Sequence, residues 1–191
     1  MSRSPIVPLS LLALMLAAGV AAPAYAQQKK QPPAQNASAN AAPGGAQTFL
    51  LGTFGDWKAL MSGKDKGKVC YALAQPKERK PAGLNRDPAY LFISNRVGDG
   101  AKNEVAMKLG FAGKVGQDGT LSIGGANFVV LASGESAFLK NPAQEGQLIE
   151  AMKKASELTI KVASLRGNET TDKYSLKGFS DALTRMAKEC P

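Results

Sequence analysis

From Phe49 onward the chain is a succession of short segments rich in aliphatic and aromatic residues, separated by glycine, asparagine, aspartate or proline. Segments of this kind predict β-strands joined by turns. Between 103 and 111, Val105, Met107 and Leu109 alternate with other residues and therefore share one face of a strand. The segment 89–97 is partly apolar on both faces, which is typical of a central strand. The predicted strands are 49–54, 57–61, 68–75, 89–97, 103–111, 120–123, 126–132, 136–139, 156–166 and 172–176.

Two segments have a helical period instead. Residues 142–155 follow Asn141, a typical N-cap, and begin with a proline, which suits the first helical position. Residues 180–189 place Leu183 and Met186 on one face. Many short strands with two short helices, one of them at the C-terminus, predict a mainly β fold of the sandwich type. A partly open barrel is the alternative.

The first residues have the pattern of a secretory signal peptide. Arg3 supplies a positive start, residues 9–20 are almost wholly apolar, and 24–26 read Ala-Tyr-Ala, a typical cleavage site. We therefore expect residues 1–26 to be removed after Ala26 and the product to be periplasmic or secreted. The apolar run is short for a membrane span, so we expect no transmembrane segment after cleavage; an uncleaved anchor is the alternative.

Residues 27–47 contain mainly glutamine, alanine, proline, glycine and asparagine. Such a stretch buries too little apolar surface to offset the entropy of ordering it. We expect a disordered Pro/Ala/Gln-rich tether at 27–47 and a folded domain at 48–191.

The two cysteines, Cys70 and Cys190, predict one disulfide, because an isolated pair in an exported protein usually bonds. Closing a loop of this length removes roughly 4–5 kcal/mol of denatured-chain entropy. A redox or intermolecular role is the alternative, although no C-x-x-C spacing supports it. Trp57 is the sole tryptophan, and we expect it in the core and not at a ligand.

The chain is basic, with a net charge of +9 that falls to +8 without Arg3. Aromatic residues do not interleave with the lysines as stacking platforms would, so we expect no nucleic acid partner. Clustered cations instead suit an anionic partner such as lipopolysaccharide, a phospholipid head group or an acidic host surface. The candidate contacts are Lys64, Lys66, Lys68, Lys77, Arg79 and Lys80. Solvated loops and strand ends are the alternative interpretation of each group.

The chain has no histidine, which excludes a Ser-His-Asp triad, a Cys-His dyad and a His-ligated metal site. Two cysteines are too few for a four-thiolate zinc or iron–sulfur site. Residues 98–100 resemble the start of a dinucleotide-binding motif, but a strand and not a helix follows them. We therefore expect no catalytic residues, no metal and no cofactor. Carboxylates such as Glu135, Glu145 and Glu150 leave a hydrolase as an alternative.

Three local patterns, taken together, resemble the invasion-associated locus B family of α-proteobacterial exported proteins. Gly55-Asp56-Trp57 opens the domain, and residues 69–75 (Val-Cys-Tyr-Ala-Leu-Ala-Gln) follow on a strand. The most specific pattern is the closing string Ser-Leu-Lys-Gly-Phe-Ser-Asp-Ala-Leu at 175–183. The resemblance extends from about Phe49 to Cys190.

The resemblance implies an immunoglobulin-like β-sandwich with Trp57, Tyr71, Gly178 and Phe179 as structural motif residues. The family is named for invasion of red blood cells, and it supplies no catalytic residues. Members often carry further cysteines after the tryptophan and ahead of a helix, which this chain lacks.

These observations together predict an exported, non-enzymatic envelope protein of the invasion-associated locus B type. It would act by binding an unknown protein or an anionic partner at the cell envelope or a host surface. A periplasmic accessory or chaperone-like module for envelope proteins is the first alternative, and a carboxylate-dependent hydrolase is the second.

Overall fold

A computed structural model describes residues 47–191 of the chain. Most of its strands coincide with the segments in which apolar and polar residues alternate. The strands are β1 (Thr48–Phe54), β2 (Trp57–Ser62), β3 (Val69–Ala74), β4 (Glu78–Lys80), β5 (Tyr90–Arg96), β6 (Glu104–Lys108), β7 (Asp118–Ile123), β8 (Ala126–Ser133), β9 (Ser136–Leu139), β10 (Glu157–Ala163) and β11 (Glu169–Ser175). The helices are α1 (Glu145–Lys154) and α2 (Phe179–Glu189), with short 3-10 helices η1 (Asp65–Gly67) and η2 (Pro142–Gln144). The predicted signal peptide and the predicted tether, except Gln47, lie outside the described residues.

The mainly β class with two helices, one of them at the C-terminus, is confirmed. Among the described strands only β4 has no predicted counterpart. It is a run of three charged residues, and its pairing with β11 makes it a strand. The strand predicted at 103–111 ends earlier, at Lys108. Gly110 has a φ of 73°, and a Cβ there would overlap the carbonyl oxygen of Asp87.

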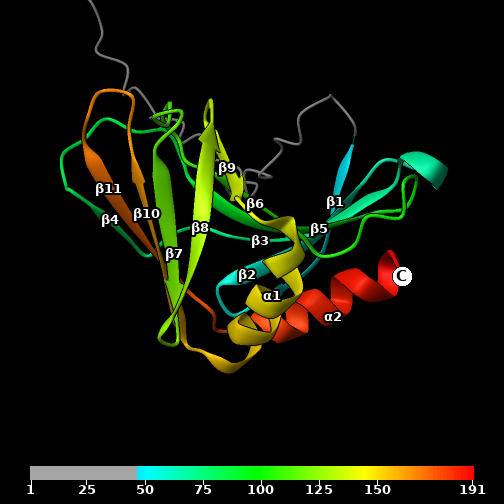
Figure 1. Cartoon of the computed structure of the whole chain (residues 1–191). Helices are drawn as coiled ribbons and strands as arrows, with labels where there is room; N and C mark the ends of the chain where they lie inside the picture. The colour runs from blue at the N-terminus through cyan, green and yellow to red at the C-terminus, as the bar shows by residue number, and fades with distance from the viewer. Residues whose placement is uncertain (1–46) are drawn as a thin grey trace, which may run out of the picture. The chain divides into compact units, whose positions relative to one another are not determined.

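The strands of the described region form one antiparallel sheet in the order β1-β2-β3-β5-β6-β9-β8-β7-β10-β11-β4. In Figure 1, β7, β8, β10 and β11 stand on one side of the domain, and β1, β2, β3 and β5 lie toward the other. Arg79 of β4 donates hydrogen bonds to the carbonyl oxygens of Asp87 (2.8 Å) and Leu109 (2.7 Å), close to the ends of β5 and β6. The sheet therefore curls until its last strand returns to its middle. The two layers of the expected immunoglobulin-like sandwich are parts of one continuous sheet, which brings the fold close to a partly open barrel.

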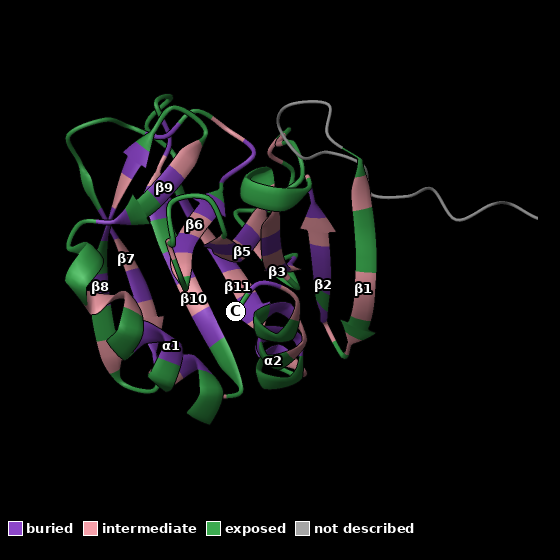
Figure 2. Cartoon of the chain, turned by 90° about the vertical axis from the view of Figure 1, so that its right-hand side faces the viewer, coloured by how far each residue is buried: buried purple, intermediate pink, exposed green. Residues whose placement is uncertain are grey.

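The inward faces of the sheet and the two helices share one hydrophobic core. Buried stripes along the strands in Figure 2 mark these inward faces. Val105 and Met107 lie in the core, as their alternation predicts. α2 packs against β1, β2 and β3, and α1 adds Leu148 and Met152. Asn141 caps the turn ahead of α1, since its Oδ1 accepts a hydrogen bond from the Ala143 N–H at 3.2 Å.

Trp57 is fully buried where β2 meets α2. Its ring lies 4.8 Å from the ring of Phe179, between centroids, at a tilted angle. Its Nε1–H donates to the carbonyl oxygen of Ser175 at 3.0 Å, so the polar end of the indole is satisfied inside the core. Trp57 therefore joins the first hairpin to the strand-to-helix junction.

Two glycine turns interlock beside this tryptophan. The Asp56 N–H donates to the carbonyl oxygen of Lys177 at 3.0 Å, and a Cβ on Gly55 would lie 2.6 Å from that oxygen. Gly178 has a φ of 87°, and a Cβ there would overlap the carbonyl oxygen of Phe54. The two backbones approach so closely that only glycine fits at both positions. This contact explains why the opening and closing sequence patterns occur together.

Gly178→Ala should destabilise the domain by about 3 kcal/mol or more, because it adds a backbone clash to the cost of the left-handed conformation. Gly167→Ala is the matched control. Gly167 has a φ of 86° and nothing lies within 4 Å of an added Cβ, so its cost should be only about 1–2 kcal/mol. Urea unfolding of both variants measures the difference, and equal losses would refute the interlocked-turn account.

Candidate functional site

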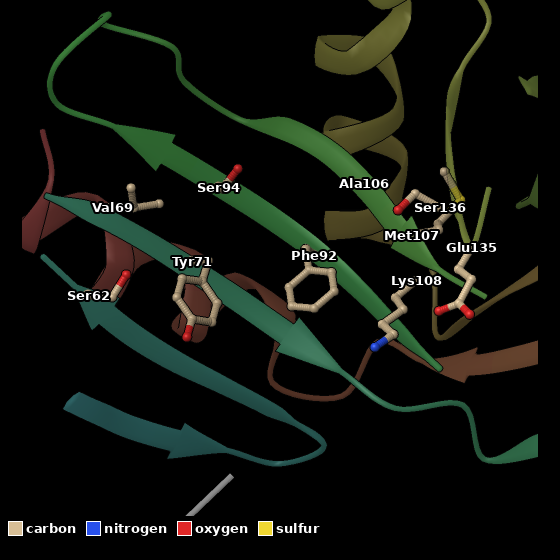
Figure 3. A pocket seen from close by; sticks show the side chains of 10 residues that line it. All are labelled: Ser62, Val69, Tyr71, Phe92, Ser94, Ala106, Met107, Lys108, Glu135 and Ser136. Carbon is tan, nitrogen blue, oxygen red and sulfur yellow. The ribbon is translucent and has the colours of Figure 1, made fainter. Parts of the chain in front are cut away.

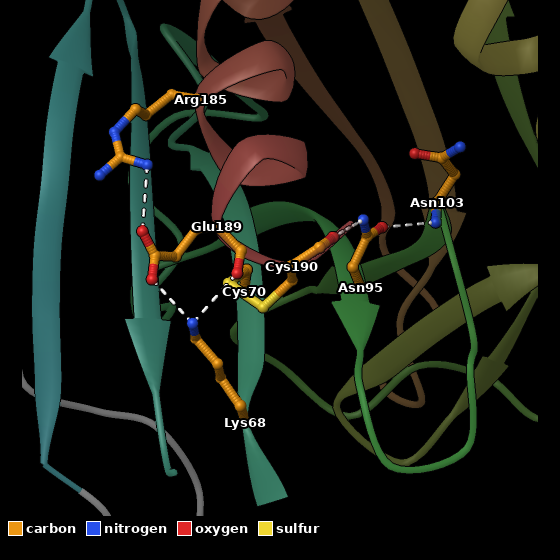
Figure 4. Close-up of a disulfide and its surroundings, with 7 residues drawn as sticks. All are labelled: Lys68, Cys70, Asn95, Asn103, Arg185, Glu189 and Cys190. Carbon is orange, nitrogen blue, oxygen red and sulfur yellow. Dashed lines mark hydrogen bonds and ion pairs between the residues drawn. A yellow bond between two sulfur atoms is a disulfide. The ribbon is translucent and has the colours of Figure 1, made fainter. Parts of the chain in front are cut away.

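Cys70 and Cys190 form a disulfide between β3 and the end of α2, with Cα atoms 5.9 Å apart. Both cysteines are fully buried. Figure 4 shows the polar contacts around them. Asn95 donates through Nδ2 to the Cys190 carbonyl oxygen at 2.8 Å, and its Oδ1 accepts from the Asn103 N–H at 2.9 Å.

Lys68 forms further contacts beside the disulfide, with Glu189. Its Nζ donates to the Glu189 side chain at 2.7 Å and to the Glu189 carbonyl oxygen at 3.0 Å. Arg185 also reaches the Glu189 carboxylate, at 3.3 Å. These hydrogen bonds, that from Lys68 above all, hold the pKa of Glu189 below its usual value. The disulfide and the ion pairs together fasten the last turn of α2 to the sheet, which is a structural role.

The remaining basic candidates divide into two groups. Lys77 pairs with Asp56, Arg79 pairs with Asp172 at 3.1 Å, and Lys80 pairs with Glu78 at 2.8 Å. Lys64 and Lys66 are exposed and form no ion pair within residues 47–191. The two groups flank opposite ends of β3, and a strand of this length spans roughly 20 Å. They therefore do not merge into one cationic patch.

Asp172, the carboxylate that pairs with Arg79, is buried. It accepts hydrogen bonds from Arg79 at 3.1 Å and from Arg86 at 3.3 Å, and the Arg86 side chain is only 7 % exposed. Burial raises the pKa of Asp172, and the two guanidinium groups oppose that shift. Since Arg79 also bonds to Asp87 and Leu109, the cluster ties β4 and β11 to the middle of the sheet. All of these Arg79 contacts lie within the folded domain.

A groove of about 520 Å³ lies on the solvent side of the sheet, over β2, β3, β5 and β6. Its volume is within the range of small-molecule and peptide sites. Figure 3 shows the side chains that line it, with Tyr71 and Phe92 side by side on neighbouring strands. The lining residues are Ser62, Val69, Tyr71, Phe92, Ser94, Ala106, Met107, Lys108, Glu135 and Ser136.

Two aromatic rings, those of Tyr71 and Phe92, lie in this groove. The ring centroid of Phe92 lies 6.1 Å from that of Tyr71 and 5.7 Å from that of Tyr90. The apolar surface continues beyond Ala106, because Ala106 pairs across strands with Phe138, which is 40 % exposed. Large apolar side chains left half-exposed on a sheet face are typical of a binding surface.

Polar groups stand at one end of the groove. Lys108, Glu135 and Ser136 lie there together, at the junction of β6 and the β8–β9 turn. Lys108 forms no ion pair within the described part of the chain and is exposed. The groove can therefore hold an apolar or aromatic group and offer one cation and one carboxylate to its polar end.

Of the three carboxylates considered for a hydrolase, only Glu135 lines the groove. Glu135 lies in the β8–β9 turn, whereas Glu145 accepts a hydrogen bond from the Val105 N–H at 3.0 Å and Glu150 pairs with Lys153 at 2.7 Å. The described residues contain no group of three or more cysteine, aspartate and glutamate side chains that could hold a metal ion. No helix among residues 47–191 has the length and apolar character needed to cross a membrane.

A protein-family model described as invasion associated locus B protein matches residues 57–187, from β2 to α2. The chain belongs to the invasion associated locus B family. The matched region contains both Trp57 and the Gly178–Phe179 junction that packs on it, and it also contains the whole groove. Neither the comparison with curated proteins nor the comparison with solved structures gave a match.

Tyr71 could be singled out from the sequence, but the groove that it lines could not. The visible signal was the two-sided apolar character of 89–97, interpreted above as a mark of a central strand. In β5 the side chains of Leu91 and Ile93 enter the core, while Tyr90 and Phe92 are half-buried on the other face. The second apolar face therefore belongs to the groove.

Replacing both cysteines with serine should lower the melting temperature by several degrees, because the closed loop of 120 residues is released. The loss should equal that of the oxidised wild type on reduction with dithiothreitol, and the reductant should not shift the double variant. Differential scanning calorimetry measures both. A reduction-insensitive wild type would remove the disulfide from this account.

Proposed function

We propose that this chain is an exported, non-enzymatic binding protein that acts at the cell envelope or at a host surface, with the aromatic groove as its binding site. Membership of the invasion associated locus B family supports the general assignment. The signal-peptide pattern of residues 1–26 supports export. The observation that carries the proposal is the pair Tyr71 and Phe92, which are only partly buried on the solvent side of a sheet whose other side is the core.

The chemistry of the groove favours binding over turnover. Its walls are apolar, so a partner gains free energy by burying apolar surface against the two rings. Its hydroxyl groups, Ser62, Ser94 and Ser136, come without a histidine anywhere in the chain to act as a base. Lys108 at one end favours a partner with a negative group beside its apolar part.

The ion pairs also reduce the set of residues proposed to contact an anionic partner. Lys68, Lys77, Arg79 and Lys80 already have carboxylate partners inside the domain, so a ligand would have to compete with those pairs. Among the six residues suggested by the sequence, Lys64 and Lys66 are the ones left for an anion. In the groove itself the cation is Lys108.

In-cell photo-crosslinking tests this proposal. A benzophenone side chain replaces Phe138, which adjoins the groove, in cells that export the full chain. We expect specific crosslinked species, and we expect Tyr71→Ser in the same chain to lower their yield about tenfold, since central aromatic anchors carry most of the energy of such interfaces. Tyr71→Phe, which keeps the ring, should retain them.

The control places the same probe at Val115, which is 73 % exposed in the loop between β6 and β7 and does not line the groove. Crosslinks to the same species from Val115, or a yield at Phe138 that Tyr71→Ser leaves unchanged, would contradict the proposal. Captured envelope proteins of the same cell would identify the partner as an envelope component, and capture only in the presence of host material would identify a host surface.

A further inference from the structure

The two edges of the sheet are built differently. The edge strand β4 has three residues, Glu78, Arg79 and Lys80, and shortness and charge are the usual protection of a sheet edge. The opposite edge strand, β1, has seven residues with the sequence Thr-Phe-Leu-Leu-Gly-Thr-Phe and carries no charge. Among the described strands β1 pairs only with β2. Figure 2 shows β1 at the outer margin of the sheet.

The apolar side chains of β1 are unusually open to solvent. Phe49 is 40 % exposed and Leu50 is 60 % exposed. A bulge shifts the register with β2 between Leu50 and Gly52, so residues 48–50 form the straight part of the free edge. An uncharged, exposed edge of this kind is a template for pairing with another strand.

Cations surround this edge. Lys58 of β2 lies opposite Thr53, and Lys64 and Lys66 follow Ser62, which pairs with Thr48 at the other end of β1. All three lysines are exposed and form no ion pair within residues 47–191. Asp65 stands between two of them, and Asp56 at the hairpin turn is already paired with Lys77. The free edge is therefore apolar along its length and positive at both ends.

The outward row of side chains leads from this edge into the groove. Leu50 pairs across strands with Leu60, and Leu60 pairs with Tyr71. Leu60 is only 4 % exposed although it is on the solvent side, because Leu50 and Tyr71 flank it. A strand added beside β1 would place its outward side chains next to Leu50 and extend the same apolar row.

We propose that β1 binds an extended segment of another polypeptide by strand addition, and that this segment combines apolar residues with glutamate or aspartate. Main-chain hydrogen bonds to the free edge supply the affinity, and the three lysines select acidic segments over basic ones. A second copy of this chain fits poorly, because antiparallel pairing of β1 with itself brings Lys58 of one molecule toward Lys64 and Lys66 of the other. This site adjoins the groove through Leu60 but does not depend on it.

The test uses a fluorescent synthetic peptide of alternating valine and glutamate, as long as β1, with the exported domain. Fluorescence anisotropy should show binding, and hydrogen exchange should slow at the amides of residues 48–54 when the peptide is present. A peptide with proline in place of valine, which has no main-chain N–H at those positions, should not bind. A peptide with lysine in place of glutamate should bind at least about tenfold more weakly.

Two matched pairs of variants locate the site. Leu50→Glu should weaken binding about tenfold, whereas Leu165→Glu, at a leucine that is 68 % exposed elsewhere, should not. Lys64→Glu with Lys66→Glu should weaken it as well, and Lys114→Glu with Lys154→Glu, an equal charge change at exposed lysines, should have a much smaller effect.

No binding, or binding without slower exchange in β1, would overturn the inference. Binding that Tyr71→Ser abolishes and Leu50→Glu leaves intact would also overturn it and would place the peptide in the groove, in favour of the proposed function. Loss of specific crosslinking at the groove with intact peptide binding at β1 would contradict the proposed function and leave this inference standing, so the two failures are distinguishable.

Discussion

The fold depends on one backbone contact, that between the hairpin turn at Gly55 and the strand-to-helix junction at Gly178. A Cβ at either glycine would collide with a carbonyl oxygen of the other turn, and the Asp56–Lys177 hydrogen bond joins the two. Trp57 then packs on Phe179 within the same junction. This arrangement sets the direction of α2, which brings Cys190 to Cys70 and lets the helix cover the inward faces of β1, β2 and β3.

Because α2 and α1 fill the inside of the curled sheet, the outside of β3, β5 and β6 has no covering element among the described residues. Its aromatic side chains are consequently only partly buried, as Tyr71 and Phe92 are. Successive side chains of a strand point to opposite faces of the sheet, so alternate residues of these strands pack in the core or face the groove. A binding protein needs such a division, since the binding face can then vary without loss of the core.

Most of the strands and both helices could be predicted, because each carries its own alternation or helical period. The groove could not, since it depends on the sheet order that places Tyr71, Phe92 and Ala106 on neighbouring strands. The ion pairs could not be predicted either. Arg79 pairs with Asp172, which lies 93 residues further along the chain, and nothing in the local sequence distinguishes Arg79 from the unpaired Lys64. The single continuous sheet could not be predicted for a related reason, because it depends on pairings between distant segments, β6 with β9 and β7 with β10, that no local pattern specifies.

We propose that the solvent side of the sheet binds while the inward side holds the fold, and dye binding tests this division most directly. Anilinonaphthalene sulfonate joins an aromatic system to an anion, which suits Tyr71, Phe92 and Lys108. The native domain should enhance its fluorescence, and Tyr71→Ser with Phe92→Ser should remove most of that signal while the melting temperature falls by only a few degrees. Val115→Ser with Leu165→Ser, at residues 73 % and 68 % exposed, is the control and should keep it. Equal signals from the two double variants, or cooperative unfolding lost in the first, would contradict the account.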